Sequence, residues 1–228
     1  MLHQDFTKMD RLIGKTTALA IFFLLVMYAV TLTMGLLSLE SKLEPISDPF
    51  FSIMEILIIV IAPLMVVLMA VVHAYAAPNV KTLSLTALIF MSILACITCS
   101  VHFIILTVSR QAESIVALPW ISLFFSFKWP SVIYALDILA WDLFFSLSMF
   151  FAAPVFKGDR LKDSVRILMI VSGVLSLAGL IGPIVGSMQI RNIGIVGYVG
   201  VFSIVCLLLA KVFSRTELYE ESIAKNEK

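Results

Sequence analysis

Four ionisable side chains interrupt long apolar stretches of this 228-residue chain and are its first candidates for chemistry: Glu55, His102, Asp137 and Asp142. An ionisable group in hydrocarbon is costly unless it is paired or reached by water, and such groups often mark ion or substrate pathways. Carboxylate and imidazole groups brought together can bind a cation or a polar solute, carry protons, or pair with one another. These four residues therefore form the predicted binding pocket.

Two cysteines share a helical spacing with the histidine, in the order Cys96-x-x-Cys99-x-x-His102. Thiolate and imidazole are zinc ligands, and CxxC is also the spacing of redox-active thiols. One helix, however, spreads these three groups over about 120° around its axis. A reactive thiolate is usually stabilised at a helix N-terminus, whereas this apolar setting disfavours it. The sequence therefore favours structural thiols and predicts no metal site.

Established catalytic and cofactor motifs are missing from the sequence. It contains no Walker-type phosphate loop, no H-E-x-x-H and no G-x-S-x-G. With 16 Lys and Arg against 15 Asp and Glu, the net charge is +1, and no basic face indicates a nucleic-acid partner. The sequence leaves any cofactor unknown.

The composition shows which environment must position these residues. Hydrophobic residues make up 61% of the chain and charged residues 14%, with a mean hydropathy of +1.08. Soluble domains are about 45–50% apolar. Because the apolar runs cannot all be buried in one water-soluble core, lipid must solvate them. We predict an all-α, polytopic membrane helix bundle that forms a single domain over residues 1–228, with the lipid bilayer as its first partner.

Six segments are long enough to cross a bilayer, which takes roughly 20 apolar residues in a helix. Helices are expected because every backbone N–H and C=O must find its partner within such a segment. The predicted spans are residues 16–39, 51–76, 83–108, 131–156, 164–188 and 193–213, followed by a charged tail at 214–228.

A further apolar stretch, Ile115–Phe127, is too short to be a seventh span. Its roughly 13 residues give only ~20 Å of helix. It contains Pro119 and lies beside Trp120 and Trp129, a residue type that favours the headgroup layer. We expect a short interfacial or re-entrant segment between the third and fourth spans.

The distribution of Lys and Arg supports six spans with both termini in the cytoplasm. Of the 16 such residues, 12 then lie on the inner side and 4 on the outer side, namely Lys42, Arg110, Lys128 and Arg191. This agrees with the positive-inside rule. If Ile115–Phe127 crossed the membrane, 6 would lie inside and 10 outside. We expect a multi-pass protein of the plasma membrane.

This topology places the four candidate residues in the outer half of the bundle. Glu55 lies about one turn below the outer end of its span, and His102 about two turns below. Asp137 is nearly two turns from the outside, and Asp142 is near the midplane. We predict an outward-facing pocket lined by Glu55, His102 and Asp142, with Asp137 near its mouth. Asp137 and Asp142 are separated by about 140° around an α-helix axis, so one of them is expected to point elsewhere.

A structural alternative explains the same residues without a ligand. His102 would pair with one carboxylate, while Glu55 and Asp137 would reach the membrane surface with their charged ends. Ser92 continues the stripe of Cys96, Cys99 and His102, which predicts a polar lining along the third span. His73, near the inner end of the second span, is expected to be an interface-anchored polar residue.

Glycine and proline predict how the helices pack and bend. Gly182-x-x-x-Gly186 has the small-residue spacing that allows close helix contact. Gly182-Pro183 and Pro63 are expected to kink their helices. The segments Phe22–Tyr28 and Phe144–Phe150 resemble each other, which is a weak hint of two inverted three-helix halves, as in many transporters.

Three classes of function are compatible with this pattern. The leading hypothesis is a small-solute or proton-linked transporter, or a sensor that uses the same pocket. The second is an intramembrane enzyme on a lipid-like substrate, with His102 and a carboxylate as general base and acid. The third is a non-catalytic accessory subunit whose polar residues pair internally. The ligand, whether small molecule or ion, and the oligomeric state stay open.

Overall fold

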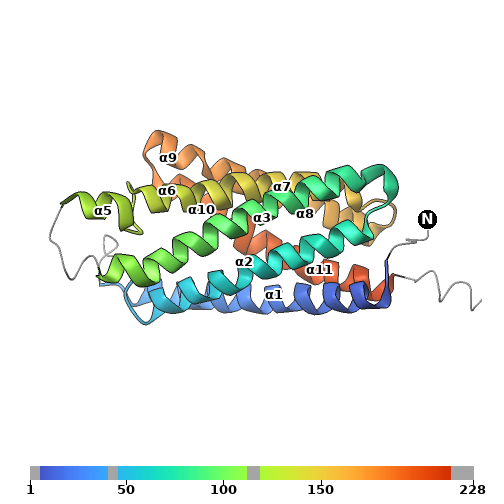
Figure 1. Ribbon diagram of the computed structural model, residues 1–228, viewed down its shortest axis with the longest axis horizontal. Coiled ribbons are helices and arrows are strands. Elements are labelled where there is room, and N and C mark those ends of the chain that lie inside the picture. Colours follow the sequence, from blue (N-terminus) through green and yellow to red (C-terminus); the bar gives the residue numbers. More distant parts are fainter. Residues whose placement is uncertain (1–5, 41–45, 112–118, 217–228) are drawn as a thin grey trace, which may run out of the picture.

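The computed structural model describes residues 6–40, 46–111 and 119–216, and throughout these ranges the regular structure is helical (Figure 1). Within these described ranges, six helical units are long and apolar enough to cross a membrane. They are α1 (Lys8–Leu37); α2 (Phe50–Tyr75); η1 (Pro78–Val80) with α3 (Lys81–Ile104) and η2 (Ile105–Ser109); α6 (Val132–Ile138) with η3 (Leu139–Phe144), α7 (Phe145–Ala152) and η4 (Ala153–Val155); α8 (Arg160–Gly179) with α9 (Ile181–Val185); and α10 (Met188–Ile195) with η5 (Val196–Val201) and α11 (Phe202–Arg215).

Each predicted span corresponds to one of these units, so the predicted all-helical, six-span architecture is confirmed. Four starts lie at least four residues earlier than predicted, and those of the third and fifth units are Pro78 rather than Leu83 and Arg160 rather than Ser164. The first helix begins at Lys8 rather than Thr16, because Thr7 and Asp10 cap it reciprocally through side chain and backbone. The sixth begins at Met188 rather than Ile193, and this shift changes the composition of the site.

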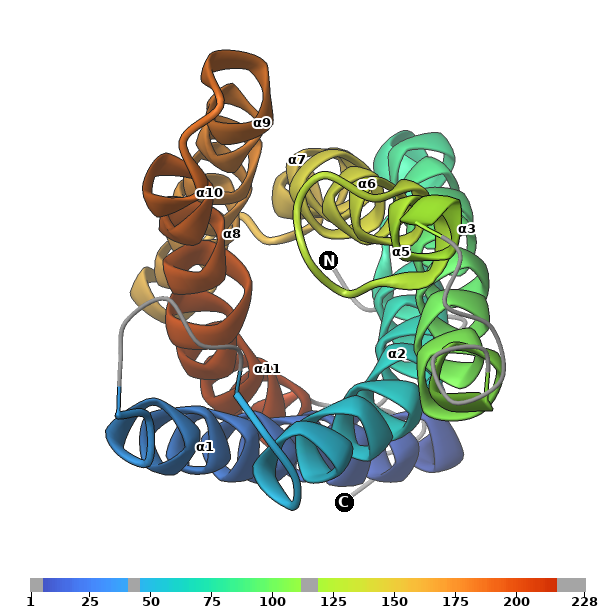
Figure 2. The same cartoon turned by 90° about the vertical axis from the view of Figure 1, so that its left-hand side faces the viewer.

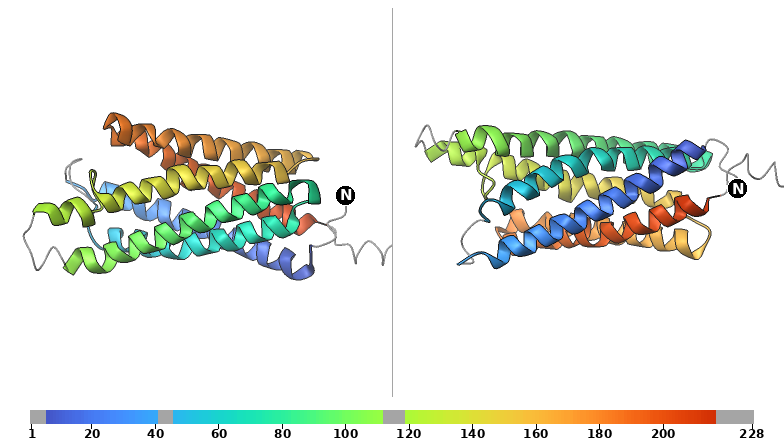
Figure 3. Two further views of the ribbon diagram at one scale, coloured as in Figure 1. Left: turned by 45° about the horizontal axis from the view of Figure 1, so that its top comes forward. Right: turned by 90° about the horizontal axis from the view of Figure 1, so that it is seen from below.

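The six units form a closed ring in chain order (Figure 2). Each unit packs against the ones before and after it, and α11 returns to pack against α1. Figure 3 shows α1 crossing the outside of the bundle beside α2 and α11. A Cβ at Gly14 would lie 2.7 Å from Val71 and 2.8 Å from Phe213, so this glycine sets how closely α1 approaches its neighbours.

This ring is not built from two inverted halves. A two-fold axis in the membrane plane reverses the direction in which successive helices follow one another around a ring. Spans one to three and spans four to six instead follow one another in the same direction (Figure 2). The resemblance between Phe22–Tyr28 and Phe144–Phe150 therefore has no counterpart in the architecture.

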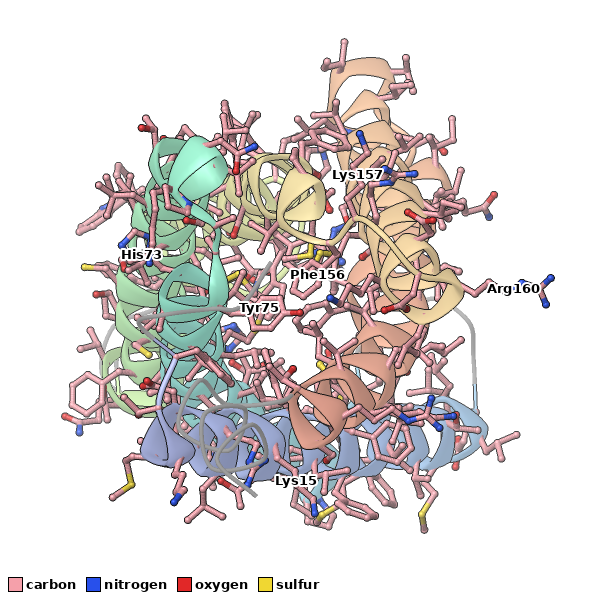
Figure 4. All side chains as sticks on the ribbon, turned by 90° about the vertical axis from the view of Figure 1, so that its right-hand side faces the viewer. Lys15, His73, Tyr75, Phe156, Lys157 and Arg160 are labelled. Carbon is pink, nitrogen blue, oxygen red and sulfur yellow. The ribbon has the colours of Figure 1, made fainter. Side chains whose placement is uncertain are left out.

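The two ends of the bundle differ in charge. One end, called here the terminal end, holds the start of α1 and the end of α11. Within the described residues it carries most of the basic side chains, and Figure 4 shows Lys15, Lys157 and Arg160 there. The opposite end, called the far end, has Arg110, Lys128 and the buried Arg191.

Aromatic rings close the centre of the bundle at the terminal end. Phe6, Tyr75, Phe156 and Phe213 are each at most 3% exposed, and we call them the aromatic plug. The Tyr75 ring stacks on Phe156 at 5.8 Å and meets Phe6 edge-on at 5.3 Å. Figure 4 shows Tyr75 and Phe156 in the middle of this end. From the plug toward the far end, the interior is filled by buried apolar residues that include Met65, Leu68, Met69, Met91 and Met149.

Pro63 and Pro183 lie within membrane-length helices, and a cysteine replaces the hydrogen bond that Pro63 removes. Pro63 lacks the N–H that would bond the carbonyl of Ile59 in the preceding turn. The thiol of Cys99 on α3 donates to that carbonyl at 3.8 Å. In the fifth unit the helix is interrupted at Leu180, between α8 and α9, next to Gly182-Pro183. α2 continues through Pro63 as one helix. The kinks expected at both prolines stay predictions.

The segment between the third and fourth units contains α5 (Pro119–Phe125), which lies at the far end (Figure 1). Seven residues rise only about 10 Å, too little to cross a bilayer. Residues 112–118 of the predicted re-entrant segment lie outside the described ranges. Its position relative to lipid stays a prediction.

Candidate functional site

A cavity of about 240 Å³ opens in the far half of the ring. All but the fifth helical unit contribute to its wall. Its charged and amide side chains are Glu55, His102, Asp137, Arg191 and Asn192, and its aromatic side chains are Tyr28, Phe51, Phe127, Tyr134, Trp141 and Tyr198. The wall is therefore amphipathic, with ionic groups set among aromatic rings.

Five ionisable side chains from four helical units form one buried chain beside this cavity. His102 is at its centre, with Nδ1 2.5 Å from Oε2 of Glu55 and Nε2 3.2 Å from Oδ1 of Asp137. Arg191 then joins the two aspartates: its guanidinium donates to Oδ2 of Asp137 at 3.5 Å, and its Nε lies 3.8 Å from Oδ2 of Asp142. We call these five residues the ionic chain. Each side chain in it is at most 7% exposed.

The structure thus brings together all four residues that the sequence singled out, but it corrects the expected positions of the two aspartates. Asp137 lines the cavity and bridges His102 to Arg191, whereas Asp142 is fully buried behind the wall. The structural alternative also fails in one respect. Glu55 and Asp137 are 3% and 4% exposed, so neither reaches the membrane surface with its charged end.

A π-helical turn explains why both aspartates point to the same partner. η3 (Leu139–Phe144) interrupts the α-helix between them. In a π-helix the hydrogen bond runs from residue i to i+5, so residues five apart come close along the axis. The separation of about 140° expected for an α-helix is therefore reduced. Both Asp137 and Asp142 consequently reach Arg191.

Arg191 is the functional candidate that the sequence analysis missed, because it was placed in a loop between the last two spans. Gly186, with φ +72°, ends α9 in a left-handed turn, where the Ser187 N–H donates to the Gly182 carbonyl at 2.8 Å. A second hydrogen bond runs from the Gly186 N–H to the Pro183 carbonyl at 3.4 Å. Together these two bonds end the helix within one turn, so α10 begins at Met188 and Arg191 lies inside the bundle. A glycine followed by serine at the end of an apolar run was the available signal.

The same turn corrects the predicted glycine packing motif. Gly186 has no atom within 4 Å of an added Cβ, so it serves the turn rather than a helix contact. Gly182 does pack closely, because a Cβ there would lie 2.5 Å from the backbone nitrogen of Arg191.

Two other glycines make the space that Asp142 occupies. A Cβ at Gly179 on α8 would lie 3.0 Å from the carboxylate, and one at Gly194 on α10 would overlap it. Within the described residues, neither carboxylate oxygen of Asp142 accepts a hydrogen bond. The negative charge of Asp142 is therefore balanced chiefly by Arg191, at 3.8 Å.

Hydrogen bonding constrains the protons of the ionic chain. Both ring nitrogens of His102 face carboxylate oxygens, and an ionised carboxylate only accepts. Either the imidazole carries two protons, or one of the acids carries a proton of its own. With the three acids otherwise ionised, three carboxylates, one guanidinium and this shared proton add up to a net charge of −1. One more positive charge, whether a proton or a bound cation, would neutralise it.

Aromatic rings hold the guanidinium in place. The Cζ of Arg191 lies 5.5 Å from the centroid of the Tyr134 ring and 5.9 Å from that of Tyr198. Cation–π contacts of this kind are worth about 2 kcal/mol or more when desolvated. Trp141 packs on Tyr198 at 5.0 Å, and Phe127 packs beside His102 at 5.6 Å.

An exposed ion pair lies near the mouth at the far end. Arg110 contacts Asp48 at 3.2 Å and donates to the Ser52 hydroxyl at 2.6 Å. The Ser52 hydroxyl, which donates to Asp48, lowers the pKa of Asp48 below its usual 3.8, and Arg110 lowers it further. A lowered pKa means that the stabilisation is present above the usual value and lost as pH falls through the lowered one. This pair therefore stays charged near neutral pH.

The predicted polar stripe on the third span does not form a lining. Ser92 and Cys96 are exposed on the outside of α3, and Ser92 bonds its own helix at Leu88. The Cys99 thiol donates to the Ile59 carbonyl, and among the described residues no group of three His, Cys, Asp or Glu side chains is placed to hold a metal ion. His73 lies at the terminal end (Figure 4), where its Nδ1 is 2.9 Å from the Ser84 hydroxyl.

Comparisons with known proteins add no assignment: no protein-family model, no curated protein and no solved structure matches the chain.

Proposed function

We propose that this chain is a proton-linked carrier of a small solute, with the cavity as its binding site. The observation that carries the proposal is the ionic chain, in which three acids, a histidine and an arginine are buried in contact with one another and reach the cavity wall through Glu55, His102 and Asp137. Intramembrane acids and histidines that are linked in this way are typical of proton relays in pumps and transporters.

The shape of the bundle supports a carrier. The cavity opens toward the far end, while the aromatic plug and the apolar interior close the terminal end. A carrier alternates between states that are open to one side at a time. Three π-helical segments, η2, η3 and η5, lie in units that line the cavity. Such segments often occur at functional sites, and here they are the proposed places for local rearrangement.

The orientation and the membrane are parts of the same proposal. The basic residues gathered at the terminal end support a cytoplasmic position for both termini, which places the cavity mouth outside the plasma membrane. A fluorescent protein fused to the C-terminus should then fluoresce in intact cells. Labelling of the connection at residues 156–159 by a membrane-impermeant reagent in intact cells would contradict this orientation.

The carrier proposal is tested by flux in liposomes. Purified protein should exchange protons when ammonium, carboxylate or neutral solutes are offered across a pH gradient, as followed with an enclosed pH-sensitive dye. Asp142→Asn removes a charge of the ionic chain, and we expect the flux to fall at least about tenfold, which corresponds to roughly 1.4 kcal/mol.

The matched control is Asp163→Asn, which makes the same chemical change at a half-buried ion pair with Arg166 near the terminal end, away from the cavity. It should retain full flux, and thermal unfolding should show both variants folded. Full flux in Asp142→Asn would remove the ionic chain from the mechanism. If the wild type shows no flux and Asp142→Asn has a lower unfolding temperature than the wild type, an accessory subunit whose acids pair internally is favoured instead.

The geometry argues against the intramembrane enzyme. A general base needs a nitrogen free to take a proton from the substrate. Both ring nitrogens of His102 are occupied by Glu55 and Asp137. Turnover of an added lipid by purified protein would overturn this argument.

A further inference from the structure

The net charge of the ionic chain limits which ligands the cavity can hold. A neutral ligand would leave the charge of −1 to be balanced by an additional proton, and an anion would add to the negative charge. Burying an unpaired charge away from water is costly. A ligand with one positive charge neutralises the chain, and so does one additional proton. The two are therefore alternatives for the same charge.

The negative part of the cavity wall is the Glu55 end of the ionic chain. Arg191 already lies between Asp137 and Asp142, with its guanidinium over the rings of Tyr134 and Tyr198. Within the described part of the chain, Glu55 forms an ion pair with His102 and with no other basic side chain, since Arg110 pairs with Asp48. A cation in the cavity is consequently expected beside Glu55.

The remaining lining decides what kind of cation fits. Near Glu55 the cavity is bordered by Tyr28, Phe51 and Phe127, together with aliphatic side chains such as Ile58. Mg²⁺ and Ca²⁺ take about six to eight oxygen ligands, and the mainly aromatic and aliphatic side chains around Glu55 supply few. Aromatic rings beside an acid are suited to ammonium groups that carry apolar substituents.

We propose that the solute is a small organic cation, an alkyl- or arylammonium, which binds beside Glu55 and displaces one proton from the ionic chain. This rests on the proposed function and specifies its substrate class. Before binding, the ionic chain holds one additional proton and is neutral. In the exchange, one ammonium ion enters and this additional proton leaves to water, so the chain with its ligand stays neutral. No covalent bond forms or breaks other than that of the departing proton.

The pH dependence of the exchange depends on titratable groups from several helices around the cavity. Near neutral pH the mouth pair of Asp48 and Arg110 stays charged, so the pH dependence of binding belongs to the interior. The titratable and charged groups that face it are Tyr28 from α1, Glu55 from α2, His102 from α3, Tyr134 and Asp137 from α6, Asp142 from η3, Arg191 from α10 and Tyr198 from η5. We expect ammonium affinity to fall as pH is lowered.

Calorimetric titration of the full chain in lipid nanodiscs tests the substrate class. The probes are tetramethylammonium, choline and benzyltrimethylammonium. The neutral control is 3,3-dimethylbutan-1-ol, which has the shape of choline without its charge, and the anionic control is 3,3-dimethylbutanoate. We expect an ammonium probe to bind and both controls to fail. Glu55→Gln should weaken binding at least about tenfold, whereas Asp163→Asn should leave it unchanged.

Proton release is measured in the same titrations by repeating them in buffers of different ionisation enthalpy. About one proton released per ammonium bound supports both the substrate class and the proton link. Ammonium binding without proton release keeps the substrate class and overturns the proton-linked carrier. Equal binding of the neutral or anionic control, or no binding of any ammonium probe up to about 10 mM, a very weak affinity, overturns the substrate class. Because wild-type protein gives these outcomes, the test does not depend on Glu55→Gln folding.

Discussion

At the scale of single residues, the space around Asp142 is the most constrained feature of the site. The carboxylate lies between Gly179 and Gly194, on two different helices, and has Arg191 as its ionic partner. A side chain at either glycine would meet the carboxylate before it met anything flexible. The glycines are therefore part of the ionic chain's geometry, although they carry no charge themselves.

Gly194→Ala should destabilise the protein, because the added Cβ would overlap the Asp142 carboxylate. Overpacking in a well-filled interior costs about 1–3 kcal/mol, and it should also separate Asp142 from Arg191. Thermal unfolding in detergent measures the effect. Gly200→Ala is the matched control, since the nearest atom to its Cβ is 3.9 Å away. It should be neutral or stabilising by up to about 1 kcal/mol. Equal unfolding temperatures for the two variants would contradict this account.

The sequence was sufficient to find the acids and the histidine but not their arrangement. Glu55, His102, Asp137 and Asp142 are conspicuous because any ionisable group in an apolar run is conspicuous. Arg191 is not, since an arginine near a span boundary has an ordinary explanation in topology. A boundary error of five residues, from Met188 to Ile193, was enough to place it in a loop.

At the scale of helical elements, deviations from regular α-helix determine what faces the interior. η3 brings Asp137 and Asp142 to one partner, and an argument at a fixed angle per residue cannot anticipate it. For the stripe of Ser92, Cys96, Cys99 and His102, the regular helix spacing holds, but the expected direction of the stripe was wrong. These residues do share a side of the helix by spacing, yet Ser92 and Cys96 face outward, because the orientation of a helix depends on its neighbours.

The contact between Cys99 and α2 can be tested as a pair. Its thiol supplies the hydrogen bond that Pro63 cannot give to the carbonyl of Ile59. Interhelical hydrogen bonds in membrane proteins average about 0.6 kcal/mol, so Cys99→Ala should lower stability by about that amount. In a Pro63→Ala background the loss should be smaller, since position 63 then provides an N–H for Ile59.

A double-mutant cycle of thermal or denaturant unfolding measures this coupling. Cys96→Ala is the control, because Cys96 is exposed on the same helix. Additive effects of the Cys99 and Pro63 substitutions would mean that the thiol does not replace the missing backbone donor.

At the scale of the whole molecule, the ring explains why a site can exist in so small a bundle. Six helices that follow one another in chain order surround a common axis, so side chains from non-adjacent spans meet in the middle (Figure 2). Composition alone was enough to predict six membrane helices, because the length and polarity of each run are local properties. The closed order of the ring depends on contacts between distant segments such as α1 and α11, which local patterns do not encode.

The aromatic plug has an electrical consequence. The cavity opens at the far end, whereas buried apolar residues fill the interior between it and the stacked rings of Tyr75 and Phe156. A membrane voltage falls mainly across such a low-dielectric layer, and each elementary charge that crosses it responds with about 2.3 kcal/mol per 100 mV. If one ammonium ion moves one way and one proton the other, no net charge crosses the layer. The exchange rate in liposomes should then be the same when valinomycin and a potassium gradient impose either sign of voltage. A rate that follows the voltage would show that the two cations do not replace each other one for one.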